Sequence, residues 1–451
     1  MDTIDADASI ETARAMVEQH TLAVSVPNPE PMLYRRIGAN TYSKLGLAMP
    51  LIYIGPIVAA KLISKYTGFG EHLLRIFLVS CVNGLVTACI VTLLFAIFCF
   101  VGYSTRLSLI VSLTAGFSTY LFVYAKSSHR DPLHALCILG AYAWPLLARE
   151  SRFKNIYFIM VGLCSALLLM SKPVLVLAVI PAWWLATKQA LRVRGQKTLF
   201  SLYGPLLIAI VLTACLARLV WGSFLATGYS KEVMTFHSSA WTTPFWNGVW
   251  VQLFAPATGL FYFNPVLCLC VLALAWKLWR RTCTELDGCL VLSIAAMIAI
   301  HAKWLSPTGG SAFGPRYLVP TVPLFFLFFI GLPLSQYKRP ILAVFISCCF
   351  IFQLIHVSVK AEQYWTFRQK TSPKMLIPHW RANIHFFLHK LTNQPEIYSA
   401  SLANRPNKRM VNLTAHRSLE GFNFWWAHLI RHPELLTTNL RHVHMQRVSR
   451  F

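Results

Sequence analysis

Long apolar runs separated by short polar loops fill the sequence from about residue 74 to residue 358. Ten of these runs approach or exceed the roughly 20 apolar residues that a helix needs to cross a bilayer. They fall at about 74–102, 107–125, 132–148, 156–170, 173–187, 199–222, 259–278, 288–302, 318–335 and 341–358. The pattern predicts an all-α polytopic membrane protein with about ten transmembrane helices.

A further apolar stretch, at 45–63, is interrupted by Pro50 and by Gly55-Pro56, and it could either span the membrane or lie in the interface. If this stretch spans the membrane, the loop at 103–106 falls on the same side as the loop at 126–131. That placement breaks the alternation between basic and non-basic loops. We therefore predict that 45–63 lies in the membrane interface.

With 45–63 interfacial, one side of the membrane receives most of the loop cations and is cytoplasmic by the positive-inside rule. These cations are Arg106, Arg149, Arg152, Lys154, Lys188, Arg192, Arg194, Lys197, Lys277, Arg280, Arg281, Lys338 and Arg339. The unusual polar segments then share the external face. They are the N-terminal segment, the loop at 126–131, the turn at 171–173, the loop at about 223–258 and a Gly-rich loop at 303–317.

Three domains are predicted from this pattern. Residues 1–73 form an external N-terminal segment with interfacial helices, residues 74–358 form the transmembrane domain, and residues 359–451 form a basic external appendage. Trp425 and Trp426 suggest that the appendage packs or lies on the membrane.

Composition supports the membrane assignment, and that assignment in turn determines how the net positive charge is interpreted. Hydrophobic residues make up 56% of the chain, which is too many for a soluble protein. The net charge of +25 comes from 41 Lys and Arg against 16 Asp and Glu. Because the cations flank membrane segments, we expect them to face anionic lipid headgroups rather than nucleic acid. The twelve cysteines lie mostly in apolar runs and predict neither disulfides nor a zinc site.

The loop at 303–317 is the densest polar segment inside the apolar region. Lys303 and Arg316 supply charge, Tyr317 supplies a stacking face, and Gly309-Gly310 permits a tight backbone path. A lysine and an arginine at this depth suggest a site for a charged ligand at the bilayer surface. An ordinary connecting loop is the alternative interpretation.

Carboxylates occur in two of the external segments. Asp5 and Asp7 open a predicted amphipathic helix, and Asp131 precedes Pro132 at the start of a span. Each is suited to cap a helix, and each is also suited to act as a general base at the membrane surface. His129, beside Asp131, is expected to be a surface residue, since no second ligand at metal spacing accompanies it.

Several cations belong to the same external segments: Arg35, Arg36, Lys44, Lys126, Arg130, Lys172, Lys303 and Arg316. Lysine near a helix end commonly extends to the headgroups, which is the plain interpretation for each of them. Lys172 and Arg316 differ because each adjoins a proline at the start of an apolar span, where charge and helix N-terminal amides together suit a phosphate.

These motifs, taken in order, resemble the GT-C fold of bacterial membrane glycosyltransferases that use polyprenyl-phosphate sugars, a group with protein O-mannosyltransferases and the lipid A aminoarabinose transferase. Resemblance covers about residues 5–335. Similar segments are Asp5 with Ala13-Arg14-Ala15-Met16, Tyr42-Ser43-Lys44, Asp131-Pro132-Leu133, Ser171-Lys172-Pro173, Gly259-Leu260-Phe261-Tyr262-Phe263-Asn264-Pro265 and Gly309-Gly310-Ser311-Ala312-Phe313-Gly314-Pro315-Arg316-Tyr317-Leu318-Val319-Pro320. The last is the most specific, although Ala312 stands where the family prefers serine.

The resemblance implies transfer of a monosaccharide from a polyprenyl-phosphate donor, with inversion, on the external face of a bacterial inner membrane. Asp5 would be the general base, assisted by Asp7 or Asp131. The donor phosphate would contact Lys44, Lys172, Lys303, Arg316, Tyr317, Gly309 and Gly310. No cofactor or metal is demanded, because the cations neutralise the phosphate. Expected partners are the lipid-linked sugar and membrane lipids, with no nucleic acid and with an acceptor that the sequence does not identify.

Two other interpretations stay open. A lipid-linked sugar or solute transporter would use the same cavity without chemistry, although no internal repeat supports it. Relatives also have a transmembrane helix before the catalytic aspartate, and none precedes Asp5. Either the chain begins downstream of the true start, or the gene is truncated, or the activity is lost and the protein is a membrane binding partner.

Overall fold

The computed structural model describes residues 4–26, 33–148, 154–193, 196–226, 241–310, 312–333 and 339–358, with residues 384, 387 and 388. Predictions for the appendage at 359–451 and for residues 227–240 lie outside this part of the chain. The elements are α1 (Ile4–Glu18), β1 (Tyr34–Ile37), β2 (Asn40–Ser43), α2 (Ala48–Thr67), α3 (Glu71–Phe100), α4 (Thr105–Phe117), α5 (Leu121–Lys126), α6 (Asp131–Leu147), α7 (Lys154–Ser171), η1 (Pro173–Val179), α8 (Ile180–Val193), α9 (Gln196–Trp221), α10 (Phe245–Leu253), α11 (Leu260–Phe263), α12 (Leu267–Arg280), α13 (Glu285–Ala302), η2 (Arg316–Thr321), α14 (Val322–Leu327) and α15 (Arg339–Ser358).

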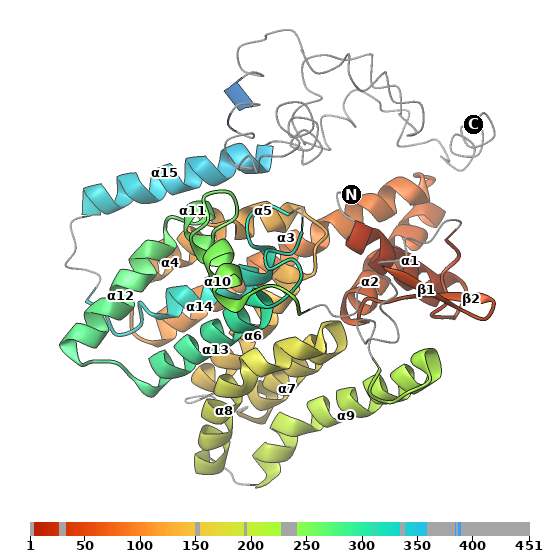
Figure 1. Ribbon diagram of the computed structural model, residues 1–451, viewed down its shortest axis with the longest axis horizontal. Helices are drawn as coiled ribbons and strands as arrows, with labels where there is room; N and C mark the ends of the chain where they lie inside the picture. Colours follow the sequence, from red (N-terminus) through yellow and green to blue (C-terminus); the bar gives the residue numbers. More distant parts are fainter. Residues whose placement is uncertain are drawn as a thin grey trace.

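The described chain is a bundle of apolar helices, as the sequence pattern predicts (Figure 1). α6 lies in its interior, packed against α3, α7, α8 and η2, and buries most of its residues. α9 packs on α7 but leaves Leu207, Ile208 and Val211 exposed. Exposed aliphatic side chains on a long apolar helix are expected to face lipid. The protein is therefore a multi-pass membrane protein.

Seven stretches within the described residues are helical, long and apolar enough to cross a membrane. They are Ala48–Thr67, Glu71–Phe100, Lys154–Ser171, Pro173–Arg192, Gln196–Trp221, Glu285–Ala302 and Pro340–Ser358. Six of them match predicted spans within a few residues. The predicted run at 132–148 corresponds to the 17-residue α6, in the interior of the bundle.

Three predicted spans are interrupted rather than continuous. The run at 107–125 is split between α4 and α5, and the run at 259–278 between α11 and α12. These two breaks are joined, since the Asn264 side-chain oxygen accepts a 2.7 Å hydrogen bond from the Tyr120 amide. The run at 318–335 begins as the 3₁₀ helix η2, and its α-helical part ends at Leu327. Broken helices are tolerated in a bilayer when protein groups satisfy the freed backbone in this way.

The apolar stretch that Pro50 and Gly55-Pro56 interrupt forms one continuous helix, α2. Pro50 lies in the first turn, where its missing N–H has no helical partner to lose, and Pro56 is accommodated inside the helix. α2 packs against α1 and α3. Its length and composition also suit a membrane span, so its interfacial placement stays a prediction.

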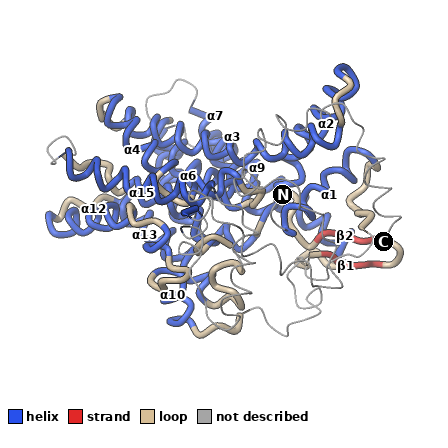
Figure 2. The backbone as a smooth tube through the Cα atoms, turned by 90° about the horizontal axis from the view of Figure 1, so that it is seen from above, coloured by secondary structure: helices blue, strands red, loops and turns tan. Residues whose placement is uncertain are grey.

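A small β-hairpin, which the sequence analysis did not predict, joins α1 to α2. β1 and β2 pair antiparallel, with Tyr34 opposite Ser43, and Gly38 with φ +60° lies in the turn. α1, the hairpin and α2 lie together on one side of the bundle in both views (Figures 1 and 2). α1 and the hairpin region also share a small core of their own, which includes Ala8, Ala15, Tyr34 and Leu45.

The N-terminal end of α13 forms a tight helical hairpin with α12. Arg281 adopts φ +55°, Thr284 caps α13 with a capping box, and a buried Lys277–Asp287 ion pair of 2.7 Å links the helices. α13 has 18 residues and therefore separates this hairpin from the Gly-rich loop by about 27 Å at 1.5 Å per residue.

Candidate functional site

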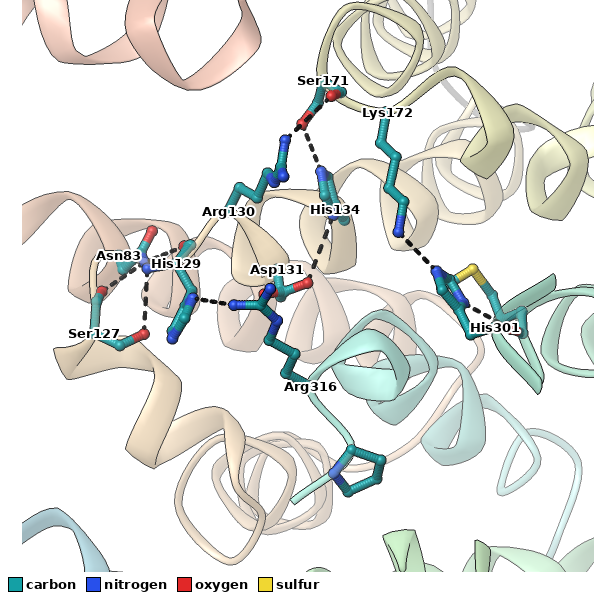
Figure 3. Close-up of polar contacts among 12 residues, drawn as sticks. Asn83, Ser127, His129, Arg130, Asp131, His134, Ser171, Lys172, His301 and Arg316 are labelled. Atoms are coloured by element: carbon teal, nitrogen blue, oxygen red, sulfur yellow. Dashed lines mark hydrogen bonds and ion pairs between the residues drawn. The ribbon is translucent and has the colours of Figure 1, made fainter. Parts of the chain in front are cut away.

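Four segments meet in the candidate site (Figure 3). They are the α5–α6 loop, the α7–η1 turn, the C-terminal end of α13 and the N-terminal end of η2. The Arg316 Nη1 atom donates to His129 Nδ1 at 3.2 Å, and Lys172 Nζ donates to His301 Nε2 at 3.0 Å. Each contact joins residues more than 100 positions apart in the chain.

The α5–α6 loop is fixed to α3 and α2 by buried hydrogen bonds. The Asn83 side-chain amide donates to the carbonyls of Ser127 at 2.6 Å and His129 at 2.5 Å. The Tyr53 hydroxyl donates to the Ser128 carbonyl at 3.2 Å. This anchoring buries His129 to 8% exposure, so the expectation that His129 is a surface residue is wrong.

The Gly-rich loop holds Arg316 against this anchored loop. The Arg316 amide donates to the Thr308 carbonyl at 3.0 Å, and the Tyr124 hydroxyl donates to the Phe313 carbonyl at 3.0 Å. Gly309 adopts φ +90°, and a Cβ there would lie 2.3 Å from Arg316 Cγ. Glycine is therefore required at 309 by both the backbone and the neighbouring side chain.

Lys172 is held by neutral aromatic and imidazole groups. Its ammonium lies 4.0 Å from the centre of the Tyr317 ring and 5.6 Å from that of Trp304. His301 stacks on Tyr317 with ring centres 4.5 Å apart. His301 Nδ1 donates to the Met297 carbonyl at 2.8 Å, which leaves Nε2 as the acceptor for Lys172. These contacts help to fix the position of Lys172.

Asp131 lies beside a second polar pair at the start of α6. Its Oδ1 is 3.9 Å from His134 Nδ1, and His134 Nε2 is 2.6 Å from Ser171 Oγ. Arg130 Nη1 donates to the Ser171 carbonyl at 3.5 Å. Asp131, His134 and Ser171 are each at most 5% exposed. A carboxylate, an imidazole and a hydroxyl are thus aligned between α6 and α7.

Lys44 lines a pocket of about 110 Å³ on the side of the site nearest the β-hairpin. Gly46, Ser171 and Pro173 also line it, and Leu216, Val220 and Trp221 of α9 form an apolar wall. Burial, and then the charge of Arg35, lowers the pKa of Lys44 below its usual value. Burial disfavours the charged form of the ammonium, and the positive charge of Arg35 disfavours it further.

The N-terminal carboxylates lie in α1, whose helical start confirms the predicted helix. Asp7 is exposed. Burial, and then the charges of Glu11 and Asp7, raises the pKa of Tyr34 to about 12, which places Asp7 near β1. The side chain of Asp5 lies outside the described part of the chain. The roles predicted for Asp5 and Asp7 stay predictions.

Apart from Asp5 and Asp7, the predicted residues therefore fall into three groups. Asp131, Lys172, Arg316, Tyr317 and Gly309 belong to the connected cluster. Lys44 lines the pocket that Ser171 shares with this cluster. Lys303 and Gly310 are exposed, and Lys303 contributes its carbonyl to a 3.2 Å hydrogen bond from the Thr243 amide.

Sequence analysis did not single out His134, Ser171 or His301 as site residues. His134 follows Asp131 by three positions, which places both on one face of a helix. His301 is a polar residue in the last turn of an otherwise apolar span, a feature that itself suggests function. Ser171 belongs to the Ser171-Lys172-Pro173 motif, but nothing in the sequence indicates its contact with His134, which is 37 positions away.

Within the described residues, no three or more His, Cys, Asp or Glu side chains are grouped so that they could hold a metal ion.

Comparisons with known proteins give only distant similarities. No family model and no curated protein sequence matches this chain. Among solved structures, it is similar to ArnT from Cupriavidus metallidurans in the apo state, with 14% identity and a TM-score of 0.47 over 87% of this chain and 66% of that one. The same protein bound to undecaprenyl phosphate gives 13% identity and a TM-score of 0.48, over 87% and 67% of the two chains.

A third similar structure is the oligosaccharyltransferase AglB from Archaeoglobus fulgidus, in complex with an inhibitory peptide and a dolichol-phosphate. It gives 12% identity and a TM-score of 0.44 over 91% of this chain and 57% of that one. This chain therefore spans about two thirds of the length of ArnT and somewhat less of AglB.

Proposed function

We propose that this protein is a membrane glycosyltransferase that moves a monosaccharide from a polyprenyl-phosphate donor to an acceptor on the external face of the membrane. The observation that carries the proposal is the meeting of Arg316, Lys172 and Asp131 at one end of the bundle, from three separate segments. A buried carboxylate beside fixed cations is suited to move a proton while a phosphate leaves. The motifs that resemble the GT-C group supply these same residues.

The donor phosphate is assigned to Lys172 and Arg316, with Lys44 at the pocket. Negative charge on the phosphate grows as its bond to the anomeric carbon breaks, and cations already in position stabilise that charge without reorganising. The apolar wall formed by Leu216, Val220 and Trp221 suits the isoprenoid chain next to the phosphate.

The acceptor loses a proton as it attacks the anomeric carbon, so a base must lie beside it. Asp131 is the described carboxylate nearest these cations, and Asp5 is the base that the resemblance implies, with Asp7 in support. Because the cations balance the phosphate charge, the scheme needs no metal. The resemblance implies a single displacement that inverts the anomeric centre.

The test is transfer of radiolabel from a panel of synthetic polyprenyl-phosphate hexoses and pentoses in proteoliposomes, with a bacterial envelope fraction as the source of acceptor. We expect Arg316→Gln, Lys172→Gln and Asp131→Asn each to lower transfer on the order of 100-fold, the usual loss for a group that stabilises transition-state charge or moves a proton. Arg106→Gln is the matched control, because Arg106 is exposed and lies in the first turn of α4. Full activity in all three site variants contradicts the mechanism, and no transfer by the unaltered protein contradicts the function.

A further inference from the structure

The alignment of Asp131, His134 and Ser171 has the composition and order of a proton relay (Figure 3). Ser171 Oγ lies 2.6 Å from His134 Nε2, within hydrogen-bonding distance. Asp131 Oδ1 lies 3.9 Å from His134 Nδ1, which is too long for a hydrogen bond but close enough for charge to act. Asp131 therefore favours a proton on the side of the ring that faces it.

Packing between α6 and α7 fixes the partners. Asp131 and His134 are one helical turn apart on α6, and Ser171 is the last residue of α7, which packs against α6. Gly46 lies so close to the end of α7 that a Cβ there would be 2.3 Å from the Ser171 carbonyl oxygen. Ser171 is held between His134 on one side and the Gly46 backbone on the other.

These contacts select one tautomer of neutral His134. With Nδ1 protonated toward Asp131, Nε2 keeps its lone pair and accepts the hydrogen bond from the Ser171 hydroxyl. The Ser171 oxygen then has lone pairs that can accept a proton from a neighbouring group. The arrangement is poised to take a proton at Ser171 and to store it on His134.

Ser171 also belongs to the pocket that Lys44 and Gly46 line. A relay that begins at a pocket residue and ends at a buried imidazole connects the ligand space to a proton acceptor that the ligand does not touch. We propose that His134, in place of a carboxylate, receives the acceptor's proton through Ser171, and that the role of Asp131 is to stabilise the resulting imidazolium.

This inference rests on the proposed function and assigns the path of its proton. As the acceptor oxygen or nitrogen forms a bond to the anomeric carbon, the bond between that carbon and the phosphate oxygen breaks. The acceptor proton passes to Ser171 Oγ while the original hydroxyl proton passes to His134 Nε2. The products are the glycosylated acceptor, the polyprenyl phosphate anion and a protonated His134.

The charges around His134 couple the two halves of the reaction. Burial of His134 comes first in opposing a positive ring, and the charges of Arg130 on the preceding loop and of Lys172 before η1 add to it. The neutral His301 ring on α13 also faces His134, whereas the Asp131 carboxylate favours a positive ring. As negative charge grows on the phosphate at Lys172, it offsets this repulsion. Proton uptake by His134 is therefore easiest when the leaving group departs.

Two substitutions distinguish proton transfer through His134 and Ser171 from a purely structural role of their hydrogen bond. His134→Gln keeps an amide near the position of Nε2 for Ser171 but cannot take up a proton. Ser171→Ala removes the hydroxyl and leaves His134 intact. Ser165→Ala is the matched control, because Ser165 is a fully buried serine on the same helix whose hydroxyl donates to the Val161 carbonyl at 2.9 Å.

The measurement is kcat and KM for donor consumption in the proteoliposome assay, as a function of pH, using the synthetic polyprenyl-phosphate sugar that the unaltered protein uses. We expect kcat to fall on the order of 100-fold in His134→Gln and Ser171→Ala, with KM for the donor changed less than about 2-fold, because a general base typically contributes 100-fold or more. The fall in kcat at acidic pH should disappear in His134→Gln. Imidazole in the buffer should restore part of the activity of His134→Ala.

Folding is checked by thermal unfolding in detergent, and Ser171→Ala keeps the test decisive if His134→Gln does not fold. Folded variants with kcat within about 3-fold of the unaltered protein, or with an unchanged acidic limb, overturn the relay while leaving the glycosyltransferase function in place. An unaltered protein that consumes no donor overturns the proposed function itself. The two failures are therefore distinguishable.

Discussion

Gly309 shows how one residue positions the charge of another. Its φ of +90° is unfavourable for side chains other than glycine, and the space where a Cβ would lie is filled by Arg316 Cγ, Cδ and Nε. Gly310 has a similar φ of +80° but has no atom within 4 Å of its virtual Cβ. Substitution at Gly309 would therefore cause both backbone strain and displacement of Arg316, whereas substitution at Gly310 would cause backbone strain alone.

We expect Gly309→Ala to raise the donor KM at least 10-fold, because the added methyl group pushes Arg316 away from His129. Gly310→Ala should cost stability alone, about 1–3 kcal/mol for a residue in the left-handed region, with KM changed less than about 3-fold. Transfer kinetics and thermal unfolding of both variants check this prediction. An equal rise in KM for the two variants would show that strain, and not the Arg316 contact, accounts for the effect.

At the scale of elements, interruptions and close approaches build the site. The segment before α2 lies on the end of α7 because Gly46 lets the two backbones meet. A Cβ at 46 would be 2.2 Å from the Met170 carbonyl oxygen and 2.3 Å from that of Ser171. This approach brings Lys44 and Ser171 to the same pocket.

Gly46→Ala is expected to separate the two segments, since backbone atoms cannot move aside as a flexible side chain does. We expect a loss of about 1–3 kcal/mol of stability, as for overpacked sites, together with a loss of donor affinity through Lys44. Gly55→Ala in α2 is the control, because Gly55 is exposed and its virtual Cβ meets nothing within 4 Å; alanine there should be neutral or slightly stabilising. Thermal unfolding and donor KM are the readouts, and similar behaviour of the two variants would argue against the close contact.

The helices also show one feature that hydrophobic periodicity does not predict, which is a break within a membrane span. Apolar runs at 107–125 and 259–278 predict continuous spans because hydrophobicity does not report a local break. The breaks at Tyr120 and Asn264 stabilise each other, because the backbone amide of Tyr120 donates a hydrogen bond to the side-chain oxygen of Asn264. A pattern read along one segment contains no information on such a partner.

At the scale of the whole molecule, the cations and the site divide between the two ends of α13. Lys277, Arg280 and Arg281 lie at the α12–α13 hairpin, and His301 and Lys172 lie at the other end. By the positive-inside rule we expect the hairpin end to be cytoplasmic and the site end to be external. This orientation determines which compartment supplies the acceptor.

Cys283 makes the orientation testable without adding a probe. It is exposed in the α12–α13 hairpin. We expect a membrane-impermeant maleimide to leave Cys283 unlabelled in intact cells and to label it in inverted vesicles. Leu305→Cys, at an exposed position of the Gly-rich loop, should behave in the opposite way in a Cys283→Ser background. Labelling of Cys283 from outside intact cells would reverse the topology and place the site in the cytoplasm.

Sequence by itself determined the membrane class, the approximate spans and the segments that carry cations and carboxylates, because burial in lipid demands long apolar runs and leaves polar residues conspicuous. It also supplied Asp131, Lys172 and Arg316 as candidates. Only the tertiary structure decided that His129 meets Arg316, that His301 holds Lys172 and that His134 joins Asp131 to Ser171. These contacts depend on helix packing between distant segments, and a hydrogen bond of this kind leaves no periodic trace in either segment.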